Sequence, residues 1–382
     1  MHPVVRLILL LIPTAFVVAV PSVIVARRFG RRLGCLDGEG AQGHAKANVR
    51  AVPNTGGIAI FFGVALPMTV GLIVLHWAGI DFLGSYGTAL QEHLPRISQQ
   101  TMMAVGLLVC LLILHVMGVI DDRRPLGPWI KLCVQTGCAL VMVWLFDCRL
   151  LTLLDTQPGL DAVAPWPSIV LTVLWLLVVT NAINFMDNMD GLAAGVTAIV
   201  ATLFLIAACI NAQWLIAAVL ALLLGALLAF LMFNFPPASI FMGDGGSLVI
   251  GFLLGFLTVR TTYVPDDDPT SGWYGVFMPL VILAVPLYDF CSVVAIRLSQ
   301  GRNPLVGDQQ HLSHRLVQRG LSPARAVLVI WGCTLAIGLS GIGLGRLPGW
   351  QALLAGIQTI VILAVMAGYE HLLNRAVRED QP

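Results

Sequence analysis

Five aspartates lie at or just beyond the ends of long apolar segments, where a carboxylate is costly unless it is paired, hydrated or bound to a metal. They are Asp121 and Asp122 after LLILHVMGVI, Asp187 and Asp190 after LLVVTNAINFM, and Asp244 in FNFPPASIFMGDGGS. Solvation of a helix end explains any one of them. It explains the whole set poorly, because each group has Gly, Asn or Pro nearby. Their context therefore marks them as candidate functional residues.

Asp121 and Asp122 are adjacent, so their side chains cannot point in the same direction on a regular helix. One of them can face a ligand while the other orients a cation or a partner. Both suit a hard cation such as Mg²⁺, which prefers oxygen ligands and keeps part of its water. The alternative is simple pairing with Arg123 and Arg124, which follow directly.

A second polar series has a spacing of three residues: Asn181, Asn184, Asp187 and Asp190. On a helix this spacing predicts four side chains on nearly one face. Four polar groups are too many to bury without ligands. The alternative is a polar seam between packed helices.

Basic side chains that suit an anion occur later in the chain. His311 and His314 are three residues apart, and Arg315 follows. Without a third ligand the histidine pair is a weak zinc signal. Beside an arginine it fits a phosphate or pyrophosphate better.

The stretch KANVRAVPNTGGIAI precedes the second apolar segment and could also meet an anion. Lys46 lies at its start, and Gly56 and Gly57 lie at the helix start, where exposed backbone N–H groups suit a phosphate. An ordinary loop-to-helix junction is the alternative for the glycines, and a signal for membrane orientation is the alternative for Lys46.

The elements that position these residues are expected to be membrane helices. Of the 382 residues 58% are hydrophobic and only 11% charged, whereas a soluble domain is about a quarter charged. A membrane span needs about 20 mostly apolar residues. About eleven segments qualify: 4–26, 55–77, 101–120, 128–146, 166–186, 192–210, 214–233, 247–263, 274–298, 326–345 and 350–370. The sequence predicts an all-α, polytopic transmembrane bundle that forms a single integral membrane domain over residues 1–382.

Most of the 21 Lys and Arg residues fall in the loops after the first, third and ninth segments and in the C-terminal tail. Basic loops face the cytoplasm. The N-terminus is therefore expected outside and the C-terminus inside, with the five aspartates on the cytoplasmic side. Carboxylates for Mg²⁺, basic groups for phosphates and glycines for close approach are the equipment of phosphoryl transfer. The surrounding bilayer implies that one substrate is a lipid.

Five stretches resemble the polyprenyl-phosphate N-acetylhexosamine-1-phosphate transferases, a superfamily that includes the phospho-N-acetylmuramoyl-pentapeptide transferases. They are PNTGGIAI, DDRRPLGPWIKL, NAINFMDNMDGLAAG, FNFPPASIFMGDGGSL and DQQHLSHRL, in the family's order. The resemblance implies transfer of a sugar-1-phosphate, GlcNAc-1-phosphate first among the candidates, from a UDP-sugar to undecaprenyl or another polyprenyl phosphate, with release of UMP and with Mg²⁺ as cofactor. This would be the first membrane step of a cell-envelope polysaccharide pathway in the plasma (inner) membrane.

The same resemblance implies roles for the site residues. Asp244 would be the leading Mg²⁺ ligand, with Asn184 second. Asp121 or Asp122 would act on the lipid phosphate. The remaining roles concern the nucleotide sugar: Asp187 and Asp190 would line its pocket with Asn181 beside them, and Lys46, His311, His314 and Arg315 would hold its phosphates or sugar. Beyond these substrates and the membrane lipid, the resemblance implies no nucleic-acid partner and leaves a homodimer open.

The chain departs from the family pattern at two positions. The usual HxHH motif has Ser313 in place of its middle histidine, and Asn48 stands where the family often has a histidine. A run of three histidines typical of the pentapeptide transferases is also absent. These differences favour the broader sugar-phosphate branch, with a pentapeptide transferase as the alternative.

Two further alternatives belong to other classes: a transporter of lipid-linked sugars and an inactive homologue. A transporter usually places ionisable groups near the bilayer midplane and contains inverted repeats. Here the polar groups lie at one face, and no repeat is detectable.

Overall fold

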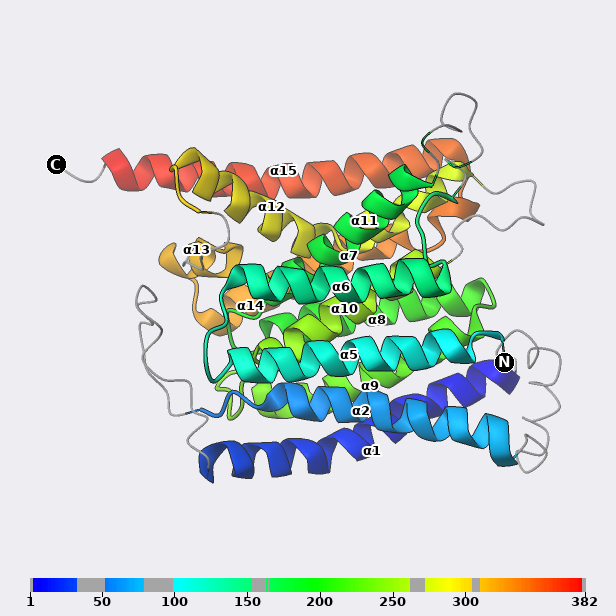
Figure 1. Ribbon diagram of the computed structural model, residues 1–382. Coiled ribbons are helices and arrows are strands. Elements are labelled where there is room, and N and C mark those ends of the chain that lie inside the picture. The colour runs from blue at the N-terminus through cyan, green and yellow to red at the C-terminus, as the bar shows by residue number, and fades with distance from the viewer. Residues whose placement is uncertain are drawn as a thin grey trace.

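The computed structural model describes residues 3–32, 52–78, 99–152, 155, 163, 165–261, 272–303 and 310–379. These ranges are helical and form no β-sheet (Figure 1). The longer helices are α1 (Pro3–Arg32), α2 (Gly56–Ile73), α5 (Thr101–Asp121), α6 (Pro128–Phe146), α7 (Trp166–Met186), α8 (Leu192–Ile210), α9 (Trp214–Asn234), α10 (Asp244–Arg260), α12 (Ala284–Ser299), α14 (Pro323–Gly341) and α15 (Gly349–Glu379). The short ones are η1 (Val74–Ala78), η4 (Trp273–Phe277), α11 (Met278–Ile282), α13 (Leu312–Gln318) and η5 (Leu344–Arg346).

The predicted polytopic helical fold is confirmed. In the described ranges nine helices are long and apolar enough to cross a membrane, and a bent pair makes ten. All eleven predicted segments overlap helices. The predicted segment that is not among these ten is 247–263, which corresponds to α10. This helix has 17 residues and lies at the short end of the length a span needs. The outer helices carry large exposed apolar side chains, such as Leu145 at 71% and Met102 at 70%, as lipid-facing surfaces require.

The predicted 274–298 segment is not one straight span. Trp273–Ile282 and Ala284–Ser299 meet at an angle of 68°. Pro286 has no backbone N–H, and its ring crowds the carbonyl of Ile282 four residues earlier. The chain therefore breaks at Leu283 and continues in a new direction as α12.

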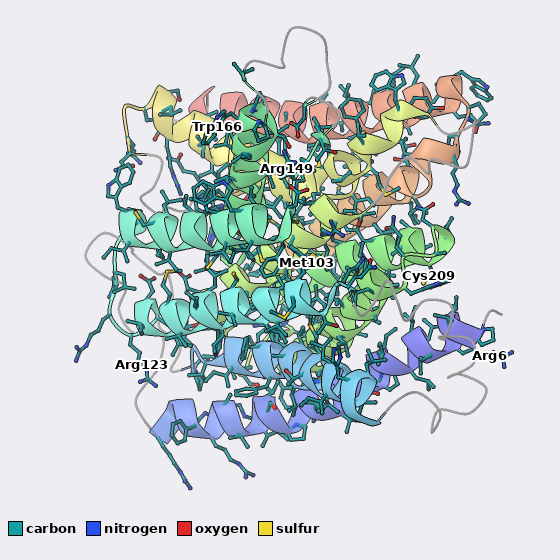
Figure 2. All side chains as sticks on the ribbon, turned by 45° about the vertical axis from the view of Figure 1, so that its right-hand side comes forward. Arg6, Met103, Arg123, Arg149, Trp166 and Cys209 are labelled. Atoms are coloured by element: carbon teal, nitrogen blue, oxygen red, sulfur yellow. The ribbon has the colours of Figure 1, made fainter. Side chains whose placement is uncertain are left out.

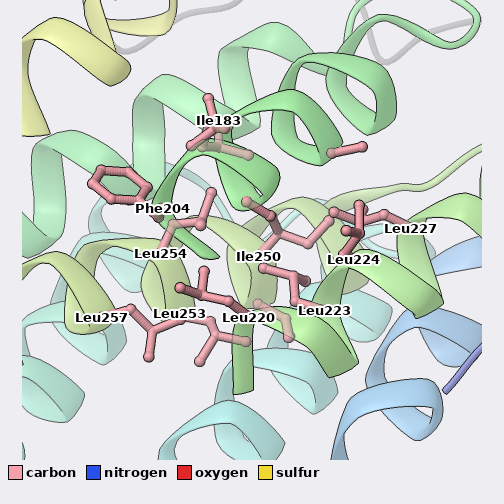
Figure 3. Packing of buried hydrophobic residues seen from close by; sticks show 14 of the residues in the cluster. Ile183, Phe204, Leu220, Leu223, Leu224, Leu227, Ile250, Leu253, Leu254 and Leu257 are labelled. Carbon is pink, nitrogen blue, oxygen red and sulfur yellow. The ribbon is translucent and has the colours of Figure 1, made fainter. Parts of the chain in front are cut away.

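Helix α10 lies at the centre of the bundle, in contact with α2, α5 and α7. Every residue from Gly245 to Val259 is buried. Its side chains, including Leu253 and Leu257, belong to one continuous apolar core with those of α9 (Figure 3). Because α10 is enclosed along its length, its first residue, Asp244, has a fixed position.

The long helices run side by side across the bundle, and α13 lies at one end of it (Figure 1). Arg123, which follows α5, and Arg6, near the start of α1, lie at opposite ends (Figure 2). The aspartates that follow α5 and α7 therefore share an end with α13.

Candidate active site

The site is built around the N-terminus of α10. Asp122 follows α5, and its Oδ1 accepts hydrogen bonds from the backbone N–H of Asp244 (2.9 Å) and from Nδ2 of Asn54 (3.0 Å). Its Oδ2 accepts from the N–H of Gly245 (3.2 Å). The carboxylate thus caps backbone donors that a helix start leaves without partners. Burial raises the pKa of the Asp122 carboxyl well above its usual range, and the charge of Asp244 raises it further.

Glycines let the neighbouring helices approach α10 closely. A Cβ on Gly118 of α5 would lie 2.4 Å from the Gly245 nitrogen, and a Cβ on Gly57 of α2 would lie 2.3 Å from the Gly246 nitrogen. The N–H groups of Gly56 and Gly57 donate to the carbonyls of Phe241 and Met242, both at 2.9 Å. The expectation that these two N–H groups bind a phosphate is therefore wrong, because the backbone already uses them.

Lys131, in the first turn of α6, supplies a cation between two of the aspartates. Its Nζ lies 3.0 Å from Oδ2 of Asp121 and 2.9 Å from Oδ2 of Asp244. Asp121 also accepts a hydrogen bond from the backbone N–H of Leu126 (2.8 Å) through Oδ1. The two adjacent aspartates therefore diverge as expected: Asp122 faces the α10 backbone and Asp121 faces a cation. The cation that Asp121 faces is Lys131.

The α7 asparagines approach the same cluster. Nδ2 of Asn184 donates to Oδ1 of Asp244 (2.9 Å) and to Oγ of Ser247 (2.8 Å). Asn181 lies one turn earlier, and its Nδ2 donates to Oε1 of Gln135 on α6 (2.8 Å). Asn184 therefore lies at the Asp244 carboxylate, whereas Asn181 joins α7 to α6.

The prediction that all four members of the polar series share one helix face is wrong. Helix α7 ends at Met186, Asp187 is its C-cap, and Asp190 lies in the following turn. Oδ2 of Asp190 accepts from the backbone N–H of Ala238 (3.0 Å), so this side chain contacts the loop between α9 and α10. The series separates because Asp, Asn and Gly favour turns over helix interiors.

Helix α13 brings the histidine motif beside the end of α7. His311 packs edge-to-face on Phe185, with ring centroids 5.5 Å apart, and Oγ of Ser313 donates to Oδ1 of Asn188 (2.5 Å). The serine in place of a histidine thus joins α13 to the Asp187–Asp190 turn. His314 lies half-buried on the same helix. Nη2 of Arg315 donates to Oγ of Ser292 on α12 (3.0 Å).

Lys46 lies outside the described residues. His115, within α5, hydrogen-bonds the Gly245 carbonyl (2.7 Å) and stacks on Phe61 at 4.6 Å, which makes it a packing residue.

The donor set fits a magnesium ion that shares its coordination with a substrate. Within the described ranges, no group of three or more His, Cys, Asp or Glu side chains converges as a metal cage. Mg²⁺ needs no such cage, because it is commonly held by one or two carboxylates together with substrate phosphates. The Asp244 and Asp121 carboxylates already hold one cation, the Lys131 ammonium, between them.

Comparison with known proteins agrees with this chemistry. The family model described as "Glycosyl transferase family 4" matches residues 104–262, which run from the first turn of α5 to just beyond the end of α10. A probable undecaprenyl-phosphate N-acetylglucosaminyl 1-phosphate transferase of Bacillus subtilis is 28% identical over 95% of this chain and 93% of its own length. A decaprenyl-phosphate N-acetylglucosaminephosphotransferase of Mycolicibacterium smegmatis is 30% identical over 83% of this chain and 78% of its own. A phospho-N-acetylmuramoyl-pentapeptide-transferase of Moorella thermoacetica is 30% identical, with 80% and 87% covered.

The fold and the cluster of acids therefore define an integral membrane transferase with many spans. The chain belongs to glycosyl transferase family 4, the polyprenyl-phosphate sugar-1-phosphate transferases, and it is a glycosyl-1-phosphate transferase. This family membership confirms the family predicted from the sequence, and it argues against the alternative that the protein is a transporter of lipid-linked sugars. The relatives include both N-acetylglucosamine and pentapeptide enzymes, so they do not fix the sugar.

Three site residues were missed by sequence reasoning. Lys131, near the start of the predicted segment 128–146, was counted only among the basic residues that indicate membrane orientation, although a lysine within an apolar helix is a functional candidate by default. Asp289 on α12, 1% exposed, contacts His311, and its isolation in an apolar segment was the available signal. Asn234 joins two loops through Gly191 N–H and the Ile240 carbonyl, both at 2.9 Å, and no local pattern announces it.

Proposed function

We propose that this protein transfers a sugar-1-phosphate, GlcNAc-1-phosphate first among the candidates, from a UDP-sugar to undecaprenyl or a related polyprenyl phosphate. An oxygen of the lipid phosphate would attack the β-phosphorus of the UDP-sugar. The bond from that phosphorus to the bridging oxygen would break, and UMP would leave with the oxygen. The observation that carries the proposal is the Asp121–Lys131–Asp244 cluster at the start of α10, with Asn184 hydrogen-bonded to Asp244.

In this proposal each residue acts on one part of the substrates. Asp244, with Asn184 beside it, would hold Mg²⁺, which would neutralise charge on the diphosphate. Asp121 would orient or deprotonate the lipid phosphate, while Asp122 would fix the start of α10. Around them, the nucleotide sugar would meet the remaining polar residues: Lys46, Asn181, Asp187, Asp190, His311, His314 and Arg315.

The proposed setting is the plasma (inner) membrane, with the chain acting as one unit over residues 1–382. The concentration of basic residues beside the aspartates supports a cytoplasmic site. A soluble nucleotide sugar could then meet a membrane-bound lipid phosphate at the membrane surface. This would be the first membrane step of a cell-envelope polysaccharide pathway.

The test is UMP release by purified full-length protein with undecaprenyl phosphate and a panel of UDP-sugars. We expect release that requires Mg²⁺ and that stops when EDTA is added. Asp244→Asn should lower turnover by roughly 100-fold or more, because a metal ligand supplies several kcal/mol of charge stabilisation. Asp147→Asn is the matched control, because Asp147 follows the other end of α6 and is 75% exposed.

Each outcome of this assay has a distinct meaning. Full turnover by Asp244→Asn would refute the metal assignment alone. No UMP release with any UDP-sugar would refute the transfer proposal and favour the inactive homologue.

A pentapeptide transferase is the second candidate, because the Moorella thermoacetica relative of that name is as similar as the Mycolicibacterium smegmatis one. Including UDP-N-acetylmuramoyl-pentapeptide in the panel separates the two. Preference for that donor over UDP-GlcNAc would replace the first proposal by the second.

A further inference from the structure

A buried carboxylate on α12, that of Asp289, contacts the histidine motif of α13. Asp289 is 1% exposed, and both of its oxygens accept hydrogen bonds from α13. Oδ2 lies 2.8 Å from Nδ1 of His311, and Oδ1 accepts from the backbone N–H of Leu312 at 2.6 Å. One carboxylate thus fixes an imidazole and the backbone that carries it. A charge buried this deeply is tolerated only when it is paired and hydrogen-bonded.

The contact determines which ring nitrogen of His311 carries a proton. An ionised carboxylate only accepts hydrogen bonds, so Nδ1 must be the donor to Asp289. Nε2 then lies on the other side of the ring, away from Asp289. Among the described residues none hydrogen-bonds Nε2, and the His311 side chain is 7% exposed.

An aromatic contact also restrains the His311 ring. Phe185 on α7 contacts the His311 ring edge-to-face at an interplanar angle of 87°. The Arg297 guanidinium lies over Phe185, 5.2 Å from the ring centroid, and Phe290 packs on Phe185 at 5.3 Å. Because Phe185 directly follows Asn184, this packing fixes the imidazole relative to the Asp244 cluster.

We propose that Asp289 is a positioning residue for transfer: it holds the His311 ring with Nδ1 protonated, so that Nε2 faces the phosphate or sugar of the nucleotide substrate. This rests on the proposed function, since it assigns the residue that orients one of its substrate contacts. A carboxylate that only capped α13 would need a single oxygen on the Leu312 N–H. The second oxygen of Asp289 instead contacts Nδ1 of the His311 imidazole.

Asp289→Asn separates positioning from packing because it keeps the shape of the side chain. The Leu312 N–H requires an acceptor, so the amide oxygen should turn toward it. The amide NH₂ then faces Nδ1, which must accept, and the ring proton moves to Nε2. We expect kcat/KM for the UDP-sugar to fall roughly 10- to 100-fold, the range seen when a metal-bound histidine loses the partner that orients it.

The kinetic test is a double-mutant cycle in full-length protein. We expect Asp289→Asn to add little loss on the His311→Gln background, because the two residues act as a unit. Val293→Ala is the matched control, since Val293 lies one turn further on α12 and is fully buried. Its unfolding temperature should fall at least as far as that of Asp289→Asn while its transfer persists. Equal losses from Asp289→Asn on both backgrounds would overturn the proposal, as would wild-type turnover by Asp289→Asn or by His311→Gln.

A second measurement does not depend on turnover. In protein labelled with ¹⁵N-histidine, the signal absent from His311→Gln identifies His311. We expect Nδ1 to be protonated in the wild type and to lose its proton in Asp289→Asn. The same ring protonation in both proteins would overturn the proposal. If the wild type released no UMP, the proposed function would fall, while the ring signal would still decide whether Asp289 holds His311.

Discussion

Gly118→Ala should disable transfer although it adds a single methyl group. A Cβ at this position would lie 2.4 Å from the Gly245 nitrogen, 2.5 Å from the Asp244 carbonyl carbon and 2.6 Å from the Asp244 oxygen. All three are backbone atoms of a helix enclosed by its neighbours, so no side chain can rotate away. Relief to an ordinary contact requires a shift of about 1 Å between α5 and the start of α10. Overpacking of this kind costs about 1–3 kcal/mol of stability.

The functional loss should exceed the loss of stability. Such a shift separates the Asp122 carboxylate from the N–H groups of Asp244 and Gly245, and it moves Asp244 relative to Lys131 and Asn184. A misplacement of about 1 Å in a catalytic site can cost about 100-fold in rate. UMP release measures the loss, and a thermal unfolding curve shows that the variant remains folded.

The matched control is Gly137→Ala on the adjacent helix α6. Gly137 is also a glycine within an apolar helix, but a Cβ there would meet nothing within 4 Å. We expect turnover near that of the wild type, with equal or slightly higher stability. If Gly118→Ala were as active as Gly137→Ala, the close approach of α5 to α10 would not position the site, and the reasoning would be refuted.

Three further predictions concern the contacts around α10. Lys131→Met leaves the partly buried Asp121 and Asp244 without their shared cation, which should cost about 1–3 kcal/mol of stability after allowance for exposure. Thermal unfolding should show that Mg²⁺ stabilises this variant more than the wild type. Equal stabilisation of the two proteins would contradict a cation position shared by Lys131 and Mg²⁺. Asn234→Ala leaves the Gly191 N–H and the Ile240 carbonyl without their buried partner, so chemical unfolding should show a loss of about 2–4 kcal/mol, and a loss below about 1 kcal/mol would contradict this. The raised pKa of Asp122 means that the folded protein binds this proton more tightly than the unfolded chain does, so its contribution to stability is full below the usual pKa and falls as the pH rises through the raised one. In Mg²⁺-free buffer the unfolding temperature of the wild type should therefore rise relative to Asp122→Asn as the pH is lowered, and parallel curves would contradict this.

The apolar segments were predictable from sequence because hydropathy is summed over about 20 residues, and all eleven overlap helices. The bend at Leu283 was not, because it depends on how one proline meets a carbonyl within a run that is apolar throughout. The three-residue spacing failed for a similar reason. It fixes a common face only while the helix continues, and α7 ends at Met186. Periodicity therefore places residues correctly only within an element whose end is known.

Some site residues could be identified from the local sequence, whereas others depend on which helices become neighbours. The aspartates were identifiable because each one is a charge beside an apolar segment. Their partners were not, because the Lys131–Asp244 contact joins α6 to α10 across 113 residues and the Asp122 contacts join α5 to α10 across more than 120. Lys131 resembled the other basic residues near the ends of spans, and only the packing of α5, α6 and α10 distinguishes it. Contacts that depend on which helices become neighbours are not present in any local pattern.

The charges around α10 also explain why transfer at this site should need a metal ion. Asp121 and Asp244 share one ammonium, so their cluster remains negative before a nucleotide sugar arrives. A diphosphate would add further negative charge at a short distance, where repulsion between partly buried groups is strong. The backbone N–H groups of Asp244 and Gly245 at the start of α10 already donate to the Asp122 side chain, so they cannot meet the charge of the diphosphate. A divalent cation bound with the nucleotide would reverse this balance. We therefore expect removal of Mg²⁺ to weaken UDP-sugar binding as well as turnover, and equilibrium binding of the UDP-sugar with and without the metal would measure it.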